Sequence, residues 1–257
     1  MLNFRNINVL FTILVLLLVL AQILLGVPFY AYIVLAVVYF LLLFYGCYYV
    51  GSNFFIPVIC SAQTNKKVVS LSFDDGPTVG NTLRILQILK DSNAEAAFFC
   101  IGRHVIKNQA IFKQVYDEGH LIGNHTFSHH FWFDMFSSKK MLADMRMMDK
   151  EVSNIIGKTP KLFRPPYGVT NPNLKKAIVR GNYIPVGWSM RSMDTVIKDE
   201  KRLLNKVISK IKPGAVFLFH DTSDATVSVL PAIINHIQAN GYAIVRLDKM
   251  LNLQAYA

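Results

Sequence analysis

The sequence has no charged residue between Arg5 and Lys66, and this stretch is largely apolar. Two runs within it, residues 7–25 and 29–50, are each long enough to cross a hydrocarbon core of about 30 Å as a helix. A Gly-Val-Pro sequence separates the runs and favours a break between two helices. We therefore expect a membrane hairpin of two transmembrane helices within residues 1–60.

A cleaved signal peptide followed by one anchor is the alternative to the hairpin, because Val19-Leu20-Ala21 weakly resembles a cleavage site. The first run is long for a signal core, and the second run begins after only three residues. We therefore favour a multi-pass protein of the cell membrane, with the lipid bilayer as a partner. Two spans put both ends of the chain on one side, and the flanking charges Arg5, Lys66 and Lys67 indicate the cytoplasmic side.

Cysteine is scarce, with only Cys47, Cys60 and Cys100 in 257 residues, and their spacing forms no pair. This pattern predicts neither a disulfide framework nor a metal site built from thiolates. A disulfide between Cys60 and Cys100 stays open.

Acidic residues are also few, 16 against 27 Lys and Arg, and all of them follow Lys66. The part of the chain after Lys66 is therefore only mildly basic, and its Lys and Arg residues form no run. This distribution disfavours a nucleic-acid partner and fits a basic face turned toward anionic lipid headgroups. No feature of the sequence indicates a protein partner.

Residues 61–257 have an ordinary composition and a length that fits one globular domain. Strand-like runs cover residues 68–73, 96–100, 121–122, 161–163, 183–186, 215–219 and 243–247. Helix-like periodicity covers residues 82–90, 109–118, 138–156, 173–180, 201–211 and 229–239. This alternation predicts a mostly parallel α/β architecture, either an open sheet or a barrel.

Unusual polar residues directly follow several of the predicted strands. Asp74-Asp75, Arg164, Asp194 and His220 all fall just after strand-like segments, and the aspartate pair and Arg164 adjoin Gly or Pro turns. Binding and catalytic sites of α/β sheets and barrels are built at the carboxyl ends of the strands. We therefore expect these side chains to share one site.

His125 and His129, in the stretch GNHTFSHHF, are spaced to share one face of a helical turn. Two imidazoles and one carboxylate form a three-ligand metal site with an open position, as in catalytic zinc centres. The histidine spacing alone is weak, and the neighbouring Asp-Asp-Gly turn strengthens it.

Four motifs, SFDDG, HTFSH, RPPYG and LFHD, occur in this order and resemble those of the polysaccharide deacetylases, the NodB-homology carbohydrate esterases. The resemblance covers essentially all of residues 61–257 and implies a catalytic domain with a distorted (β/α) barrel. It also implies a divalent metal, most often Zn²⁺, held by Asp75, His125 and His129.

The resemblance further implies a role for each remaining motif residue. Asp74 corresponds to the general base and is paired with Arg164, and His220 corresponds to the general acid and is kept protonated by Asp194. The backbone N–H of Tyr167 corresponds to the oxyanion donor, and Leu218 to a wall of the acetyl pocket. Plain core packing is the equal alternative for Leu218.

Two positions depart from the family pattern. Many relatives have an aspartate where Arg191 stands and a tryptophan where Thr195 stands. The missing tryptophan removes a wall that contacts sugar, so a long polysaccharide is less secure as substrate than the reaction itself. Trp188 is a candidate to compensate in the substrate pocket, with core packing as its alternative.

The combined pattern predicts a membrane-tethered, metal-dependent hydrolase that removes an acetyl or related acyl group from the amide nitrogen of an amino sugar. A saccharide-binding domain without turnover is the alternative, but binding alone would not require Asp74 and His220. Hydrolysis of phosphate esters is disfavoured because the sequence has no second cluster of metal ligands. Relatives acting outside the membrane argue against the cytoplasmic side, so the side of the catalytic domain stays open.

Overall fold

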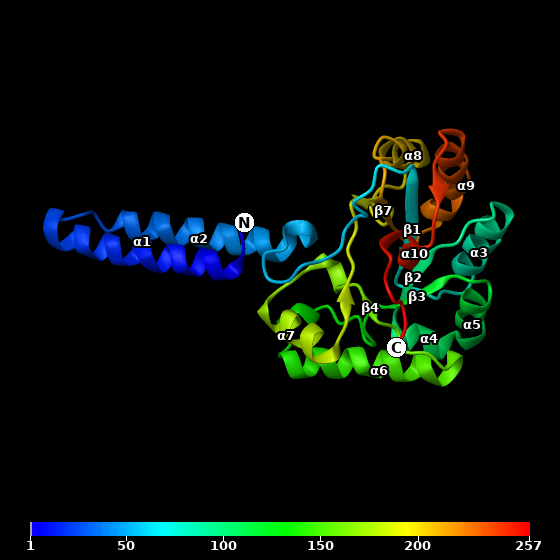
Figure 1. The fold of residues 1–257 in the computed structure, drawn as a ribbon, viewed down its shortest axis with the longest axis horizontal. Coiled ribbons are helices and arrows are strands. Elements are labelled where there is room, and N and C mark those ends of the chain that lie inside the picture. Colours follow the sequence, from blue (N-terminus) through cyan, green and yellow to red (C-terminus); the bar gives the residue numbers. More distant parts are fainter. Residues whose placement is uncertain (1) are drawn as a thin grey trace.

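The computed structural model describes residues 2–257, which form a helical hairpin and an α/β domain (Figure 1). Helix α1 (Phe4–Leu25) and helix α2 (Tyr30–Tyr48) are long and apolar enough to cross a membrane, by length and composition. The short helix η1 (Val50–Ser52) follows α2. The two helices therefore agree closely with the expected apolar runs.

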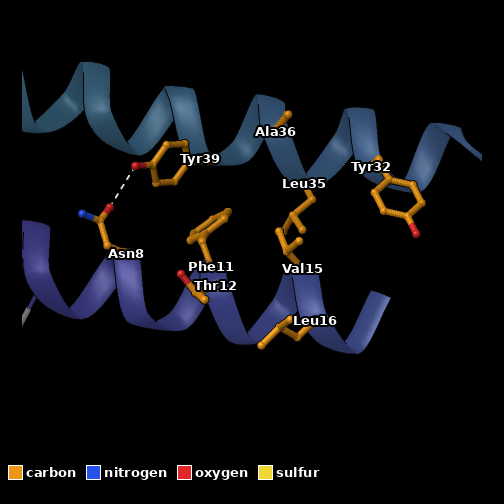
Figure 2. Close-up of a pocket in the computed structure, with 9 residues that line it drawn as sticks. All are labelled: Asn8, Phe11, Thr12, Val15, Leu16, Tyr32, Leu35, Ala36 and Tyr39. Atoms are coloured by element: carbon orange, nitrogen blue, oxygen red, sulfur yellow. Dashed lines mark hydrogen bonds between the residues drawn. The ribbon is translucent and has the colours of Figure 1, made fainter. Parts of the chain in front are cut away.

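The two hairpin helices pack along one seam, which Figure 2 shows as a groove. The Tyr39 hydroxyl of α2 donates a hydrogen bond of 2.8 Å to Asn8 Oδ1 of α1 (Figure 2). The ring of Phe11 lies 5.0 Å from that of Tyr39. This hydrogen bond gives the polar side-chain atom of Tyr39 a partner between two largely apolar helices.

Eight strands form one sheet, in the order β5-β4-β3-β2-β1-β7-β6, and β8 pairs with β1. The strands are β1 (Val68–Asp74), β2 (Ala97–Cys100), β3 (Leu121–Asn124), β4 (Leu162–Phe163), β5 (Ile184–Pro185), β6 (Met190–Arg191), β7 (Ala215–His220) and β8 (Ala243–Ile244). All these pairings are parallel. The sheet is a distorted half-barrel, which confirms the expected fold class.

The remaining helices cover the sheet (Figure 1). They are α3 (Asn81–Asp91), α4 (Gly102–Lys107), α5 (Gln109–Asp117), η2 (Phe133–Met135), α6 (Ser138–Ile156), η3 (Pro166–Gly168), α7 (Pro172–Gly181), α8 (Glu200–Ile208), α9 (Asp224–Ala239) and α10 (Leu247–Leu251). The main core lies between β1, β2 and β7 and the helices α3, α5, α8 and α9. A smaller core that includes Phe99, Leu121 and Val216 fills the inside of the half-barrel.

The chain just after the hairpin packs into the α/β domain. Val50, Ile56 and Val58 are buried in one cluster with residues of β4 and α7. The backbone N–H of Thr170 donates to the carbonyl oxygen of Cys47 at 3.0 Å. The end of α2 is therefore bound to the domain instead of leading into a free linker.

Candidate active site

The carboxyl ends of the parallel strands bring the predicted site residues together. Asp74 ends β1 and His220 ends β7, and the two residues are register partners. His125 directly follows β3, and Arg164 directly follows β4. The expected gathering of polar residues at this edge of the sheet is confirmed.

A tight turn after β1 aims the two adjacent aspartates in different directions. Asp75 has a φ of 77°, in the left-handed region that Asp tolerates better than most residues. Gly76 follows against the fully buried Asp221, and a Cβ there would lie 1.9 Å from Asp221 Oδ2. His104 Nδ1 lies 2.7 Å from the Asp75 carbonyl oxygen and fixes the turn from the other side. Only glycine fits at position 76.

Asp75, His125 and His129 form the one group of potential metal ligands found among residues 2–257, with ligand atoms within 4.8 Å of one another. Asp75 Oδ1 lies 3.5 Å from His125 Nε2 and 3.6 Å from His129 Nε2. The expected helical turn is wrong, because residues 125–130 form a loop. Positive φ values at Thr126 and His129 turn the two imidazoles toward the same carboxylate.

These three residues fit a divalent metal ion. Asp75 Oδ1 is buried and has no hydrogen-bond partner among the described residues, as expected of an atom that binds a cation. His125 Nδ1 lies 2.8 Å from the Arg164 carbonyl oxygen, so Nδ1 donates there and Nε2 faces Asp75. Burial lowers the pKa of His125 to about 3 and also lowers the pKa of His129. Both imidazoles are therefore neutral near pH 7 and able to bind metal.

Arg164 is fully buried beneath the site, and its positive charge balances the negative charge of Asp74. Its Nη1 donates to Asp74 Oδ1 at 2.7 Å and to the Ser72 hydroxyl at 2.8 Å, and its Nη2 donates to the Gly187 carbonyl oxygen at 3.0 Å. Burial raises the pKa of Asp74, and the Arg164 guanidinium opposes that shift. A carboxylate whose pKa lies above its ordinary value suits a general base.

His220, which lines the pocket, and the fully buried Asp194 form a second pair. His220 Nδ1 lies 2.8 Å from Asp194 Oδ1. Burial alone would lower the pKa of His220, but the hydrogen bond and charge of Asp194 outweigh it and raise the pKa to about 8. Burial likewise opposes ionisation of Asp194, yet its bond to His220 lowers the pKa of that carboxyl overall.

Sequence reasoning missed the residues that hold Asp194 in place. The Ser192 hydroxyl donates to Oδ1 at 2.8 Å, and the Thr226 hydroxyl donates to Oδ2 at 2.5 Å. It also missed Asp221, whose Oδ2 accepts a hydrogen bond of 2.6 Å from Thr82 behind the Asp75 turn. Only Asp221 has a sequence signal, because it lies within the LFHD motif.

A pocket of about 180 Å³ joins the metal ligands to Asp74 and His220. Its other walls are Pro165, Tyr167, Trp188, Arg191, Thr195 and Leu218. Leu218 is buried in β7 and also lines the pocket, so it belongs both to the core and to the pocket wall. Tyr167 has a φ of 59°, and its ring lies 4.9 Å from the ring of His129. All the predicted site residues except the buried Arg164 and Asp194 therefore line one cavity.

The three cysteines are free, so the disulfide that the sequence left open does not form. Cys60 and Cys100 are both partly or fully enclosed in the domain, and burial raises the pKa of each thiol. Neither thiol lines the pocket that contains the metal ligands.

Comparison with known proteins identifies the family of the α/β domain. The family model described as polysaccharide deacetylase matches residues 61–185. A peptidoglycan-N-acetylglucosamine deacetylase of Bacillus cereus is 34% identical over 199 residues, which cover 76% of this chain and 92% of that protein. The chain belongs to the polysaccharide deacetylase family. A longer family member from Listeria monocytogenes is 30% identical to this chain over 203 residues. The chain spans only 42% of the length of that protein.

Solved structures of the polysaccharide deacetylase family share the fold. The Bc1960 peptidoglycan N-acetylglucosamine deacetylase, in complex with 4-naphthalen-1-yl-N-oxidanyl-benzamide, aligns with a TM-score of 0.74 at 30% identity and covers 78% of this chain and 95% of its own. BA3943 of Bacillus anthracis, described as a pseudoenzyme of family CE4, aligns with a TM-score of 0.70 at 26% identity, over 75% of this chain and 68% of its own. Since a pseudoenzyme has this fold, turnover must be argued from the site residues themselves.

Proposed function

We propose that this protein is a metal-dependent hydrolase that removes the N-acetyl group from an amino sugar of a glycan. One observation carries the proposal: a single pocket of about 180 Å³ is lined by three potential metal ligands, by the Asp74 carboxylate and by the His220 imidazole. Hydrolysis of an amide requires a base, an acid and stabilisation of an oxyanion, and the pocket offers a group for each.

Asp75, His125 and His129 would hold the metal, and two imidazoles with one carboxylate favour Zn²⁺ among the divalent ions. When bound, the ion supplies Lewis acidity that lowers the pKa of water and polarises a carbonyl group. Asp74 accepts the proton of the attacking water. Arg164 keeps the Asp74 carboxylate oriented through the bond of 2.7 Å between Nη1 and Oδ1.

His220 supplies the proton that the leaving amine needs. The bond between Nδ1 and Asp194 fixes the ring and leaves Nε2 as the donor toward the pocket. The carbon–nitrogen bond of the amide breaks, the water oxygen joins the acetyl carbon, and the proton from His220 goes to the amine nitrogen. The Tyr167 backbone N–H stabilises the oxyanion, Leu218 contacts the acetyl methyl group, and Trp188 lines the sugar side.

The names of the relatives and the chemistry of the pocket support an N-acetylated amino sugar of the peptidoglycan type as substrate. Thr195 and Arg191 line the pocket where many relatives have tryptophan and aspartate, so the sugar contacts of this chain differ from theirs. A domain of the same fold that binds saccharide without turnover is the second candidate, supported by the likeness to BA3943.

An assay of acetate release tests the reaction class. A β-1,4-linked N-acetylglucosamine oligomer and a phosphate ester are offered to the purified protein with Zn²⁺ and, separately, with a chelator. We expect acetate from the oligomer, none after chelation, and no hydrolysis of the ester. Binding of the oligomer without acetate release in the presence of Zn²⁺ would favour the binding domain instead.

We infer further that α1 and α2 anchor residues 61–257 to the membrane as a catalytic domain, and that the helices are retained in the mature protein. The packing of Val50, Ile56 and Val58 into the domain keeps the end of α2 attached to it. The hydrogen bond between Tyr39 and Asn8, which joins α2 to α1, supports retention of both helices. Reporters fused after Ala257, one active only outside the cytoplasm and one fluorescent only inside it, identify the side of the domain. Immunoblotting of the intact chain separates the anchor from a cleaved signal peptide.

A further inference from the structure

A second pocket, of about 630 Å³, adjoins the pocket with the metal ligands. Tyr167, Trp188 and Arg191 line both pockets. The two cavities therefore share a wall and lie next to each other. We call the larger cavity the junction pocket, because it lies where the hairpin meets the α/β domain.

The outer wall of the junction pocket comes from the hairpin. Tyr48 ends α2, and Tyr49, Val50 and Gly51 follow it along the rim. All four precede residue 61, where the match to the family begins. The junction pocket is therefore built partly by a segment outside the matched family domain, and its ligand does not follow from family membership.

The junction pocket carries positive charge without a counterion. Arg191 and Lys212 line it, and none of the described residues lining it is Asp or Glu. Neither side chain forms an ion pair with any residue from 2 to 257. The guanidinium carbon of Arg191 lies 5.9 Å from the ring centre of Trp188, at the wall shared with the metal pocket. Two cations without acidic partners in a concave site attract an anionic ligand.

Exposed aromatic side chains also line the junction pocket. Tyr48 and Tyr49 are 65% and 55% exposed, and Tyr167 is 45% exposed. A tyrosine combines an apolar ring with a polar hydroxyl, which suits a sugar ring with its C–H face and hydroxyl rim. Aromatic walls and two cations together match a sugar that carries an acidic group.

We propose that the junction pocket binds the sugar unit next to the one that is deacetylated, and that Arg191 and Lys212 bind a phosphate or carboxylate on it. This inference rests on the proposed function and narrows its substrate to anionic oligosaccharides. The pocket lies at the end of α2, beside the candidate membrane span. A phosphate that joins a saccharide to a lipid is one source of the anion, and an acidic substituent of a glycan is the other.

The test measures kinetics of the full chain in detergent with five probes: a neutral N-acetylglucosamine trimer, and the same trimer with a phosphate or a carboxylate at either end. We expect wild type to prefer at least one charged probe by about tenfold in kcat/KM, as one charge-assisted contact gives. Lys212→Met and Arg191→Met should lose that preference through a higher KM. Preference for phosphate indicates a lipid-linked source, and preference for carboxylate indicates an acidic glycan.

Lys210→Met is the matched control, because Lys210 is exposed on the same segment but does not line the pocket. It removes the same charge and should keep the preference of the wild type. Equal kcat/KM for neutral and charged probes in the wild type would overturn the inference. So would a loss of preference in Lys210→Met as large as in Lys212→Met, because the effect would then be one of net charge.

Binding separates a failure of this inference from a failure of the proposed function. Calorimetry measures the affinity of the five probes for full-length Asp74→Asn, with and without Lys212→Met. Suppose that a charged probe binds more tightly than the neutral one, that this difference depends on Lys212, and that the wild-type protein releases no acetate. This result would support the junction pocket and contradict the hydrolase. Acetate release from all probes with equal affinities would support the hydrolase and contradict the junction pocket.

Discussion

Asp74 and His220 face one pocket with opposite protonation needs, and each has a buried partner that serves its own need. Arg164 stabilises the ionised form of Asp74, and Asp194 stabilises the protonated form of His220. A base that must accept a proton and an acid that must donate one can therefore coexist at one pH. This division separates a hydrolase from a saccharide-binding domain.

Asp74→Asn tests the base directly. The amide cannot accept the proton of water, so we expect acetate release to fall by about 10²–10⁴-fold. The three metal ligands are untouched, so Zn²⁺ content measured on the purified protein should stay near that of wild type. Undiminished acetate release from the variant would show that another group is the base.

The pair of His220 and Asp194 predicts the alkaline side of the pH profile. The pKa of His220 is raised to about 8, so the protonated acid is present below that pH and is lost as pH rises through it. We expect kcat/KM to fall above about pH 8. In Asp194→Asn the partner that raises the pKa is gone while burial still lowers it, so the fall should begin at lower pH. An unchanged alkaline limb in that variant would remove His220 from the acid role.

The motif residues could be predicted from sequence, but the residues that hold them in place through hydrogen bonds could not. Asp74, His125 and His220 lie in short motifs with recognisable spacing. Ser192 and Thr226, which hold Asp194, are common residue types without any spacing signal. Partners that are distant in sequence and ordinary in chemistry become visible only when the fold brings them together.

At the scale of elements, the turn after β1 depends on close contact between Gly76 and Asp221. Gly76→Ala puts a methyl group where Asp221 Oδ2 lies, and we expect a loss of about 1–3 kcal/mol in the free energy of unfolding, the usual cost of overpacking. Chemical denaturation measures the loss, and Zn²⁺ affinity should fall with it because Asp75 precedes the turn.

The double variant Gly76→Ala with Asp221→Ala checks the cause. Removing the carboxylate opens space for the added methyl group. The double variant should therefore lose less free energy of unfolding than the sum of the losses in the two single variants. Strict additivity would mean that the damage comes from elsewhere in the turn.

The long helices and strands were predictable from sequence, while the local backbone conformation of residues 125–130 was not. The helix over Ser138–Ile156 agrees with its expected bounds, because a long amphipathic pattern has few other solutions. The helical turn expected at His125 was wrong, because a spacing of four also suits a loop with positive φ at Thr126 and His129. Strand β6 (Met190–Arg191) was not expected, because its two residues lie in no apolar run of the sequence.

At the scale of the whole molecule, the hairpin and the α/β domain form one folded unit at their junction. A Cβ on Gly187 would lie 2.8 Å from Cys60 Sγ and 3.0 Å from Val50, so the chain after α2 packs directly on the backbone that leads to Trp188. The hairpin therefore completes both the core of the domain and the wall of the junction pocket. Replacing residues 1–60 with an unrelated membrane anchor would remove these contacts.

Two fragments, residues 46–257 and residues 61–257, isolate this junction because both lack α1 and all but the last three residues of α2. The shorter fragment loses Val50, Ile56 and Val58 from the cluster, and each buried aliphatic side chain contributes about 1.5–3 kcal/mol. It also loses the Cys47 and Gly46 carbonyl oxygens that accept from Thr170. We therefore expect residues 61–257 to unfold at a clearly lower denaturant concentration than residues 46–257. Equal stability of the two fragments would mean that the segment after α2 rests on the domain without supporting it, and that the fold is complete from residue 61 onward.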